Sequence, residues 1–359
     1  MKVKSPSRRK PGGVTVFLIS LSVALLLAEG ASRAFGLSKT WSSYIASRDI
    51  LNEMVTEQNR LGLTRRPHVR TKWSRGIWLE TNAVGFRDRE FRVEKKSGVK
   101  RIGFLGDSVT EGFGLEPAER FSDQAAVLLN TRKDGARFES YNFGISGLAT
   151  ADENQILRNI ASHYDLDCVV LQFGANDFKR NEYILSRQEK TPTSATPSPH
   201  PAENPEPSLR GWLAEHSAFY LALAERFNYL QLRNGSSKTL LQKMERKGLD
   251  ATPSQWEKTR QVFKDLARFC RMKKIKLVVA YVPLDVEVLM HDKTLAYRMN
   301  DGLKRLMEEL GIRFVDVLTP LRKSASADLY FDEVHLTKRG NRIIAATIAD
   351  DLTANVLIN

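Results

Sequence analysis

From Lys100 onward, short apolar runs alternate with segments of helical period, and this alternation restricts the possible folds more than any other feature. Each run is rich in Val, Ile, Phe and Tyr and is bounded by Gly, Asp, Asn or Pro, as buried strands are. The runs are Arg101–Gly106, Phe138–Phe143, Cys168–Phe173, Lys276–Val282 and Arg313–Val317. Because strands that alternate with helices form parallel sheets covered on both faces, the sequence predicts an α/β fold.

The segments between these runs carry apolar stripes at helical spacing, which begin at Phe121, Trp256, Leu295 and Ile343. An insert of about residues 179–250 interrupts the rhythm after the third run. Thr191–Ser208 holds six prolines and no aromatic residue, so we expect a solvated, disordered loop there. Leu209–Leu232 follows with the apolar spacing of one amphipathic helix.

The chain begins with a basic segment and an apolar one. The first ten residues contain five cations and no acid, and Val14–Ala28 carries no charge. This apolar length lies between a signal-peptide core and a minimal membrane span. Because Glu29 follows abruptly and no Ala-x-Ala site ends the run, we expect an uncleaved signal anchor with a transmembrane helix at about residues 12–30. Cleavage near Ala31 is the alternative.

The distribution of cations predicts the orientation of this anchor. Lys and Arg are more frequent before the apolar run than in the twenty residues after it, so the N-terminus is expected to stay in the cytoplasm. We therefore expect a basic tail and signal anchor over residues 1–34, a juxtamembrane connector over 35–97, and a domain over 98–359 that contains the insert. That domain would lie outside the cytoplasm.

Composition excludes several classes of protein. Of the net charge of +13, five charges lie in the first ten residues, and no aromatic-interleaved basic stripe follows, so no nucleic-acid partner is expected. Two cysteines, Cys168 and Cys270, exclude a disulfide scaffold and a Cys₄ metal site. The histidines outside the motifs described below lack ligand spacing, and no P-loop or dinucleotide fingerprint is present, so we expect no metal and no cofactor.

Polar motifs follow the first three apolar runs, and a fourth motif precedes the last helix. They are Gly106–Ser108 (GDS), Asn142–Gly147 (NFGISG), Gly174–Asp177 (GAND) and Asp332–Thr337 (DEVHLT). Open α/β sheets bind ligands at the carboxyl ends of their strands, where the first three motifs are expected. Taken singly, each motif is also typical of a helix cap or a turn.

The residue types in the motifs suit acyl transfer. Ser108 at a strand-to-helix turn has an exposed hydroxyl, as a nucleophile needs. The glycines of the second motif let a backbone amide approach an oxyanion, and Asn176 offers an uncharged donor. Asp332 and His335 lie within one turn, so the carboxylate can orient the imidazole as a general base.

The order and spacing of the motifs resemble those of the SGNH (GDSL) hydrolase family over residues 100–355. The resemblance implies a three-layer α/β/α sandwich with five parallel strands, of the flavodoxin-like kind. It implies Ser108 as nucleophile, His335 as base and Asp332 as the residue that orients it. An oxyanion hole would be formed by the Ser108 amide, Gly147 and Asn176. Gly144 is the alternative to Gly147, which we prefer because it follows Ser146, as in the family's Ser-Gly pattern.

The segment Thr81–Phe91 (TNAVGFRDREF) is similar to one that precedes the GDS motif in membrane-anchored bacterial members of this family. The resemblance thus implies a single-pass protein of a bacterial cytoplasmic membrane, with its catalytic domain on the periplasmic or extracellular side. Secretion after signal cleavage is the alternative.

The expected function is that of a serine hydrolase that cleaves a carboxylic ester through an acyl-enzyme. The substrate would be an ester-bearing small molecule, glycan or lipid, with an O-acetyl or another acyl group. Two alternatives remain open. The same residues would serve an O-acyltransferase that passes the acyl group to a sugar hydroxyl, and an anchored binding or assembly module would use no chemistry at all.

Overall fold

The computed structural model describes residues 13–38, 63–73, 76–131, 137–190, 209–246, 248–326 and 328–356. The chain divides into two compact units. The first comprises Met1–Ser42 and Asn204–Asn228, and the second comprises Ser43–Glu203 and Tyr229–Asn359. The basic tail and the Pro-rich segment Thr191–Ser208 lie outside the described residues.

The second unit is built on a five-stranded parallel sheet with the strand order β4-β3-β5-β6-β7. Its strands are β3 (Val99–Leu105), β4 (Arg137–Asn142), β5 (Cys168–Phe173), β6 (Lys276–Tyr281) and β7 (Arg313–Asp316). All five predicted strands are confirmed, with ends that shift by at most two residues. The chain adds β4 on one side of β3 and β5 on the other, so the order reverses at β3, and ligands bind at such a switch point.

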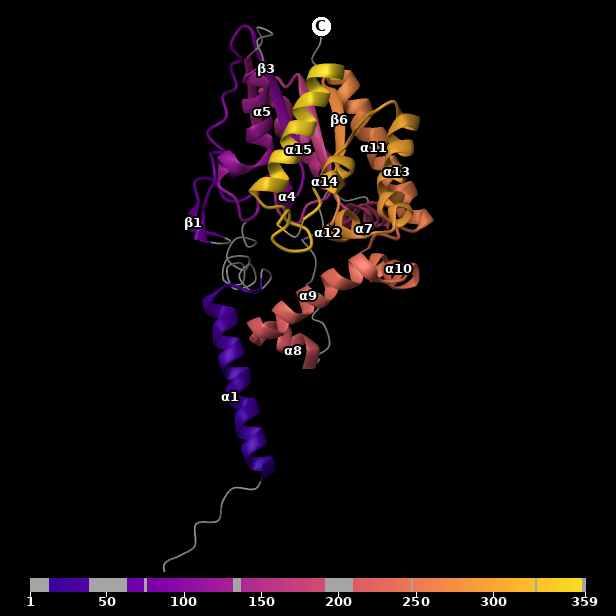
Figure 1. Cartoon of the computed structure of the whole chain (residues 1–359). Helices are drawn as coiled ribbons and strands as arrows, with labels where there is room; N and C mark the ends of the chain where they lie inside the picture. Colours follow the sequence, from indigo (N-terminus) through magenta and orange to yellow (C-terminus); the bar gives the residue numbers. More distant parts are fainter. Residues whose placement is uncertain are drawn as a thin grey trace, which may run out of the picture. The chain divides into compact units, whose positions relative to one another are not determined.

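Helices cover both faces of the sheet, as the alternating pattern predicts (Figure 1). The helices of this unit are α4 (Ser108–Glu111), α5 (Phe121–Thr131), α6 (Thr150–Asn159), α7 (Asn176–Lys190), α10 (Ser237–Arg246), α11 (Pro253–Lys273), α12 (Asp285–Leu289), α13 (Lys293–Leu310), α14 (Leu318–Lys323) and α15 (Lys338–Asp351). Apolar side chains of α5 and α15 pack on one face, and those of α6, α11 and α13 pack on the other. Neighbouring strand residues alternate between the two cores: Phe104 faces the first and Leu105 the second.

Residues 63–91, which we call the N-terminal strap, pack into this same unit. The strap contains the antiparallel strands β1 (Arg70–Lys72) and β2 (Trp78–Glu80). Trp73, Leu79 and Phe86 are buried, and Phe86 belongs to the core that also contains Leu105. The strap therefore folds as part of the body that carries the sheet.

The first unit contains α1 (Gly13–Ala34), α8 (Leu209–His216) and the start of α9 (Ala218–Asn234). Val16–Ala34 is long and apolar enough to cross a membrane, with a mean hydropathy of 1.6 and 6% of it buried. α1 thus meets the length and composition requirements of a membrane anchor, which a signal sequence also meets.

The prediction of one continuous helix over Leu209–Leu232 is wrong, because the helix is interrupted at Ser217. The Ser217 hydroxyl accepts a hydrogen bond from the Tyr220 amide and so caps the start of α9. Glu29 of α1 accepts hydrogen bonds from the Ser217 hydroxyl and from the amides of Ala218 and Phe219. The interruption thus depends on a contact with a distant part of the chain.

Candidate active site

Ser108 is the first residue of α4, directly beyond the carboxyl end of β3. The turn before it requires a glycine, because a Cβ on Gly106 would lie 2.1 Å from Thr110 Oγ1 and 2.5 Å from Gln172 Oε1. The Asp107 side chain caps α4 by accepting a hydrogen bond from the Val109 amide at 2.9 Å. The GDS motif thus forms a tight strand-to-helix turn with a partly exposed serine.

His335 and Asp332 lie in the loop between α14 and α15 and reach Ser108 across 227 residues of sequence. His335 Nδ1 lies 2.8 Å from Asp332 Oδ2, and His335 Nε2 lies 2.8 Å from Ser108 Oγ. When Nδ1–H donates to the carboxylate, Nε2 is left to accept the proton of the serine hydroxyl. The three side chains form one continuous hydrogen-bonded chain.

Backbone donors hold Asp332 in place for this contact. Asp332 Oδ1 accepts hydrogen bonds from the amides of Val334 at 2.8 Å and His335 at 2.7 Å. Burial raises the pKa of Asp332, but its hydrogen bonds and the charge of His335 outweigh burial and hold that pKa below its ordinary value of 3.8. Asp332 therefore stays ionised near neutral pH.

The two glycines of the second motif differ in their backbone bonding. The Gly144 amide donates to Asn142 Oδ1 at 2.9 Å and is buried. Gly147 is exposed and has a φ of +81°, and among the described residues its amide has no acceptor. The Ser108 amide likewise has none within the described chain. These two amides are thus free to bind an oxyanion, whereas that of Gly144 is not.

Asn176 begins α7, immediately after β5, and lies beside the GDS turn. Its Nδ2 donates to Asp107 Oδ2 at 3.2 Å, which leaves the second amide hydrogen available. Asn176 is exposed, in keeping with a side chain that meets a ligand. The structure therefore brings the residues of all four motifs to the same edge of the sheet.

Glu111 lies three residues after Ser108 and was not predicted from the sequence as a residue of the site. Glu111 is fully buried and accepts hydrogen bonds from Arg65, at 2.5 and 2.8 Å, and from Ser146. Burial raises the pKa of Glu111, but the charge and hydrogen bonds of Arg65 and the bonds from Ser146 lower it below the ordinary value of 4.5. Glu111 is thus a buried carboxylate beside the second motif.

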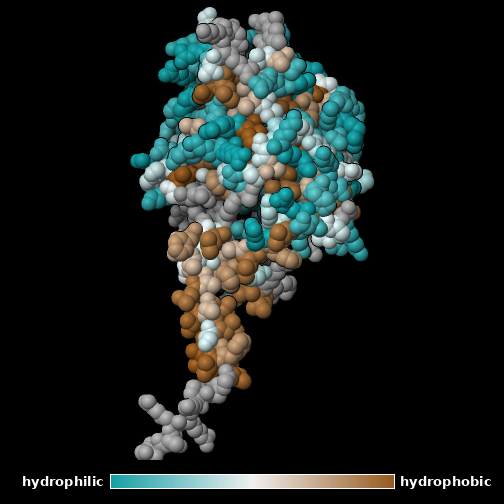
Figure 2. Space-filling model, in the orientation of Figure 1, coloured by the Kyte–Doolittle hydropathy of each residue, from teal (hydrophilic) through white to brown (hydrophobic). Residues whose placement is uncertain are grey.

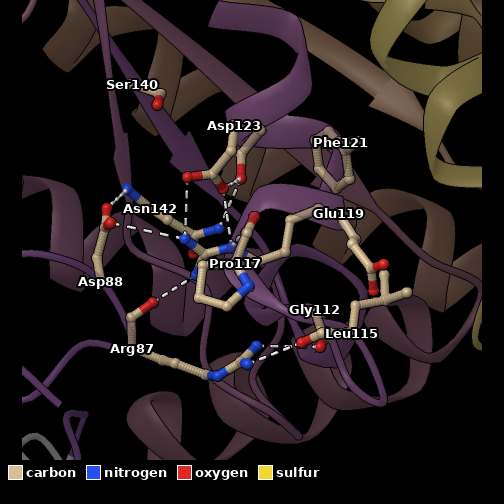
Figure 3. A network of polar contacts seen from close by, with 12 residues as sticks. Arg87, Asp88, Gly112, Leu115, Pro117, Glu119, Phe121, Asp123, Ser140 and Asn142 are labelled. Atoms are coloured by element: carbon tan, nitrogen blue, oxygen red, sulfur yellow. Dashed lines mark hydrogen bonds and ion pairs between the residues drawn. The ribbon is translucent and has the colours of Figure 1, made fainter. Parts of the chain in front are cut away.

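A second polar network, which sequence reasoning also missed, holds the loop after α4 (Figure 3). Arg87 donates to the carbonyls of Glu111, Gly112 and Leu115 at 3.1, 3.2 and 2.7 Å. Asp88 accepts a hydrogen bond from the Asn142 amide at 2.7 Å, at the end of β4.

Among the described residues, no group of three or more His, Cys, Asp or Glu side chains is placed to hold a metal ion.

The parallel sheet with helices on both faces thus carries a serine, a histidine and an aspartate that are hydrogen-bonded at its carboxyl edge, and these residue types in this order of contact are typical of serine hydrolases. The sequence profile of the GDSL-like Lipase/Acylhydrolase family matches residues 104–343. The chain therefore belongs to this family, and it is a carboxylic ester hydrolase. The resemblance that the motifs indicated is confirmed.

Solved structures resemble the chain at low sequence identity. An acetylxylan esterase from Geobacillus stearothermophilus is 15% identical, with a TM-score of 0.43 over 72% of this chain and 97% of its own. An α/β hydrolase enzyme from the metagenome of Lake Arreo is 16% identical, with the same TM-score and coverage. Neither likeness bears on the substrate. No curated protein matches the chain.

Proposed function

We propose that the protein is a serine esterase in which Ser108 is the nucleophile and His335 the general base. The observation that carries this proposal is the hydrogen-bonded chain Ser108–His335–Asp332 at 2.8 Å for each contact. Ser108 Oγ attacks the ester carbonyl carbon while His335 Nε2 takes the hydroxyl proton. The ionised Asp332 supports the positive charge on the imidazole.

The negative charge of the tetrahedral intermediate would be bound by the Ser108 amide, the Gly147 amide and the Asn176 side chain. The free state of the two amides and the exposed position of Asn176 support this assignment. Such preorganised donors act where charge develops, in the transition state. His335 then returns its proton to the leaving alcohol, and an acyl group stays on Ser108 Oγ. Water, activated by the same imidazole, releases the acid and restores Ser108.

We propose that the substrate is a glycan or a lipid that carries an O-acyl ester. We also propose that α1 anchors the catalytic domain to the bacterial cytoplasmic membrane and that this domain lies outside the cytoplasm. A sugar hydroxyl in place of water would make the same site an O-acyltransferase. The two reactions are separated by supplying an activated acetyl ester with and without an oligosaccharide acceptor. Free acetate as the main product indicates hydrolysis, and acetylated sugar indicates transfer.

The nucleophile is tested by the substitution Ser108→Ala. We expect it to abolish ester hydrolysis and fluorophosphonate labelling, and to change the free energy of unfolding by no more than about 1 kcal/mol, since a partly exposed hydroxyl supports little packing. Ser162→Ala, a serine of the segment Ala161–Tyr164 that precedes β5, is the matched control and should keep both activities. Wild-type turnover in Ser108→Ala would overturn the assignment.

A further inference from the structure

The N-terminal strap, residues 63–91, ends before the family match begins at residue 104, yet its side chains reach the candidate active site. Arg65 Nε donates to Glu111 Oε1 at 2.5 Å, and its Nη2 donates to Glu111 Oε2 at 2.8 Å. Arg65 is 9% exposed and Glu111 is fully buried. A bidentate pair of this kind fixes both distance and orientation.

Glu111 passes this constraint to the second motif. Its Oε2 accepts hydrogen bonds from the Ser146 amide at 2.8 Å and from the Ser146 hydroxyl at 2.5 Å. Ser146 directly precedes Gly147, whose amide is a proposed oxyanion donor. The contacts from Arg65 to Glu111 and from Glu111 to Ser146 therefore set the position of the backbone at Gly147.

A second part of the strap reaches the imidazole. Trp73, which is 2% exposed, packs edge-on against Phe113, with ring centroids 5.3 Å apart. Phe113 in turn stacks on the His335 ring, with centroids 4.2 Å apart and planes 29° apart. Stacking limits the rotation of the ring about its side-chain bonds. The strap is thus linked to the proposed base through Phe113 and to the proposed oxyanion segment through Glu111.

A third contact holds the loop that carries these intermediates. Arg87 of the strap donates to the backbone carbonyls of Glu111, Gly112 and Leu115, as Figure 3 shows for Gly112 and Leu115. Its guanidinium also lies over the Trp73 ring, 4.9 Å from the centroid. The loop Glu111–Leu115 is therefore fixed at its carbonyls by the strap.

We infer that the strap is an integral part of the catalytic domain. Within it, Arg65 and Trp73 are positioning residues. Arg65 places the Ser146–Gly147 backbone through Glu111, and Trp73 holds the His335 imidazole through Phe113. This inference rests on the proposed roles of Gly147 and His335. Neither residue touches the substrate, and both act on the rate through geometry.

The test compares Arg65→Lys with Arg101→Lys. Lysine keeps the charge beside Glu111 but not the bidentate geometry. Arg101 is a suitable control, because it is also buried, at 1% exposed, and pairs with Glu139 at 3.2 Å, on β3 and β4 and away from the four motifs. We would measure kcat and KM for p-nitrophenyl acetate, the rate of fluorophosphonate labelling, and the melting temperature.

We expect Arg65→Lys to lower kcat and the labelling rate about 10- to 100-fold, with KM nearly unchanged, because small displacements of an oxyanion donor cost this much. Arg101→Lys should keep wild-type kcat in its folded fraction. If Arg65→Lys does not fold, Ser146→Ala, which leaves the Arg65–Glu111 pair intact, should still lower kcat without raising KM. Wild-type kcat in folded Arg65→Lys, or in Ser146→Ala if Arg65→Lys does not fold, would overturn the inference. An unlabelled wild-type protein would instead overturn the proposed function.

A separate observation concerns the first unit. The contacts between α1 and the α8–α9 pair lie immediately after the uncharged run Val14–Ala28. Glu29 binds the N-terminus of α9, and Arg33 Nη2 donates to the His216 carbonyl at 2.9 Å. If Val14–Ala28 crosses the hydrocarbon layer, α8 and the start of α9 must lie at the level where that layer ends.

The side chains exposed on these two helices suit that level. Leu209, Trp212, Leu223 and Phe227 are between 55% and 74% exposed. Leu223 and Phe227 are four residues apart, so they share one face of α9. Figure 2 colours α1 brown and tan along most of its length, which shows the apolar surface of that helix. Tryptophan, leucine and phenylalanine are the side chains that interfacial helices bury at the headgroup boundary.

We propose that α8 and the start of α9 form an interfacial segment that buries Trp212 and its apolar neighbours in the lipid headgroup boundary beside α1. This rests on the proposed anchor. The full chain is reconstituted in phosphatidylcholine vesicles with brominated acyl chains, which quench nearby tryptophan fluorescence. Trp212→Phe is compared with Trp78→Phe, an exposed tryptophan of the second unit.

We expect brominated lipid to quench the wild type and Trp78→Phe to similar extents, and to quench Trp212→Phe clearly less. Equal quenching in Trp212→Phe and the wild type would overturn the interfacial segment. A chain that does not float with vesicles would instead overturn the anchor. The two outcomes are therefore distinguishable.

Discussion

The Asn176 side chain has two amide hydrogens. Its Nδ2 donates one of them to Asp107 at 3.2 Å, and the other is available for the proposed oxyanion. An oxyanion donor acts in the transition state and little in the ground state. Asn176→Ala should therefore lower kcat about 10²- to 10³-fold, or about 2.7–4 kcal/mol, with KM nearly unchanged. Steady-state kinetics measure both constants. Asn159→Ala, at the exposed end of α6, is the control, and a rise in KM alone would show that Asn176 only binds or shapes a turn.

The contact of Asp332 with His335 leads us to expect a change in pH dependence when Asp332 is replaced. Its pKa is held below 3.8, mainly because its bonds to His335 outweigh burial. Asp332→Asn should reduce the rate and move the acid limb of the pH–kcat/KM profile to lower pH, because the positive imidazole loses its carboxylate. An acid limb that stays in place would make Asp332 a simple cap of its loop.

The same shift has a consequence for stability. A carboxyl group whose pKa is lower in the folded state contributes stability above its ordinary pKa and loses it as the pH falls through the folded value. Denaturant unfolding of the wild type and Asp332→Asn should therefore differ at pH 6, and the difference should shrink as the pH falls below the ordinary carboxyl value of 3.8 and through the lower folded-state pKa.

Among the helices and strands, the junction between β6 and α12 carries a carboxyl group that behaves in the opposite way. Glu287 is fully buried, and its Oε2 accepts hydrogen bonds from the Tyr281 hydroxyl at 2.7 Å and the Leu284 amide at 2.9 Å. Burial raises the pKa of Glu287 to about 8, more than these bonds lower it. The folded protein therefore keeps this proton over a range in which the unfolded chain has lost it.

The sign of the effect follows from this proton. Because the folded state binds more protons than the unfolded state between about pH 4.5 and pH 8, the free energy of unfolding should fall as the pH rises through that window. The slope is at most about 1.4 kcal/mol per pH unit for one group. Glu287→Gln should flatten it, as measured by urea unfolding at pH 5 and pH 8. Asp177, whose pKa burial also raises to about 8, should leave a residual slope.

The control for this measurement is Glu308→Gln on α13, where the side chain is exposed. It should leave the pH dependence of unfolding as it is in the wild type. A wild-type slope in Glu287→Gln would mean that Glu287 is ionised in the folded state at neutral pH.

For the whole molecule, the proposed attachment to a membrane through α1 leads to a prediction. With an uncleaved anchor, the purified protein should keep its N-terminal sequence and need detergent for extraction, since about 20 apolar residues suffice to span a bilayer. N-terminal sequencing and carbonate extraction of membranes check this. A soluble mature chain that begins near Ala31 would show that the segment is a cleaved signal sequence.

Much of the architecture was predictable because the signals for it are local. Each buried strand is a short apolar run, and each covering helix carries its own stripe, so neither depends on distant residues. The first three motifs could be placed at one edge because parallel strands end there together, whereas only the contacts of the structure bring Asp332 and His335 to that edge. The junction of α8 and α9 could not be predicted, because Glu29, 188 residues away from Ser217, stabilises the break.

The sequence by itself determined the α/β sheet and named Ser108, Asn176, Asp332 and His335 as the chemical groups. Only the tertiary structure distinguishes the two glycines of the second motif, because it shows that the Gly144 amide is already bound to Asn142. It alone showed that the strap contacts α4, through the pair of Arg65 and Glu111, which lie 46 residues apart. The physical reason is that periodicity reports which face of an element is buried, whereas hydrogen bonds between distant residues depend on how the elements pack.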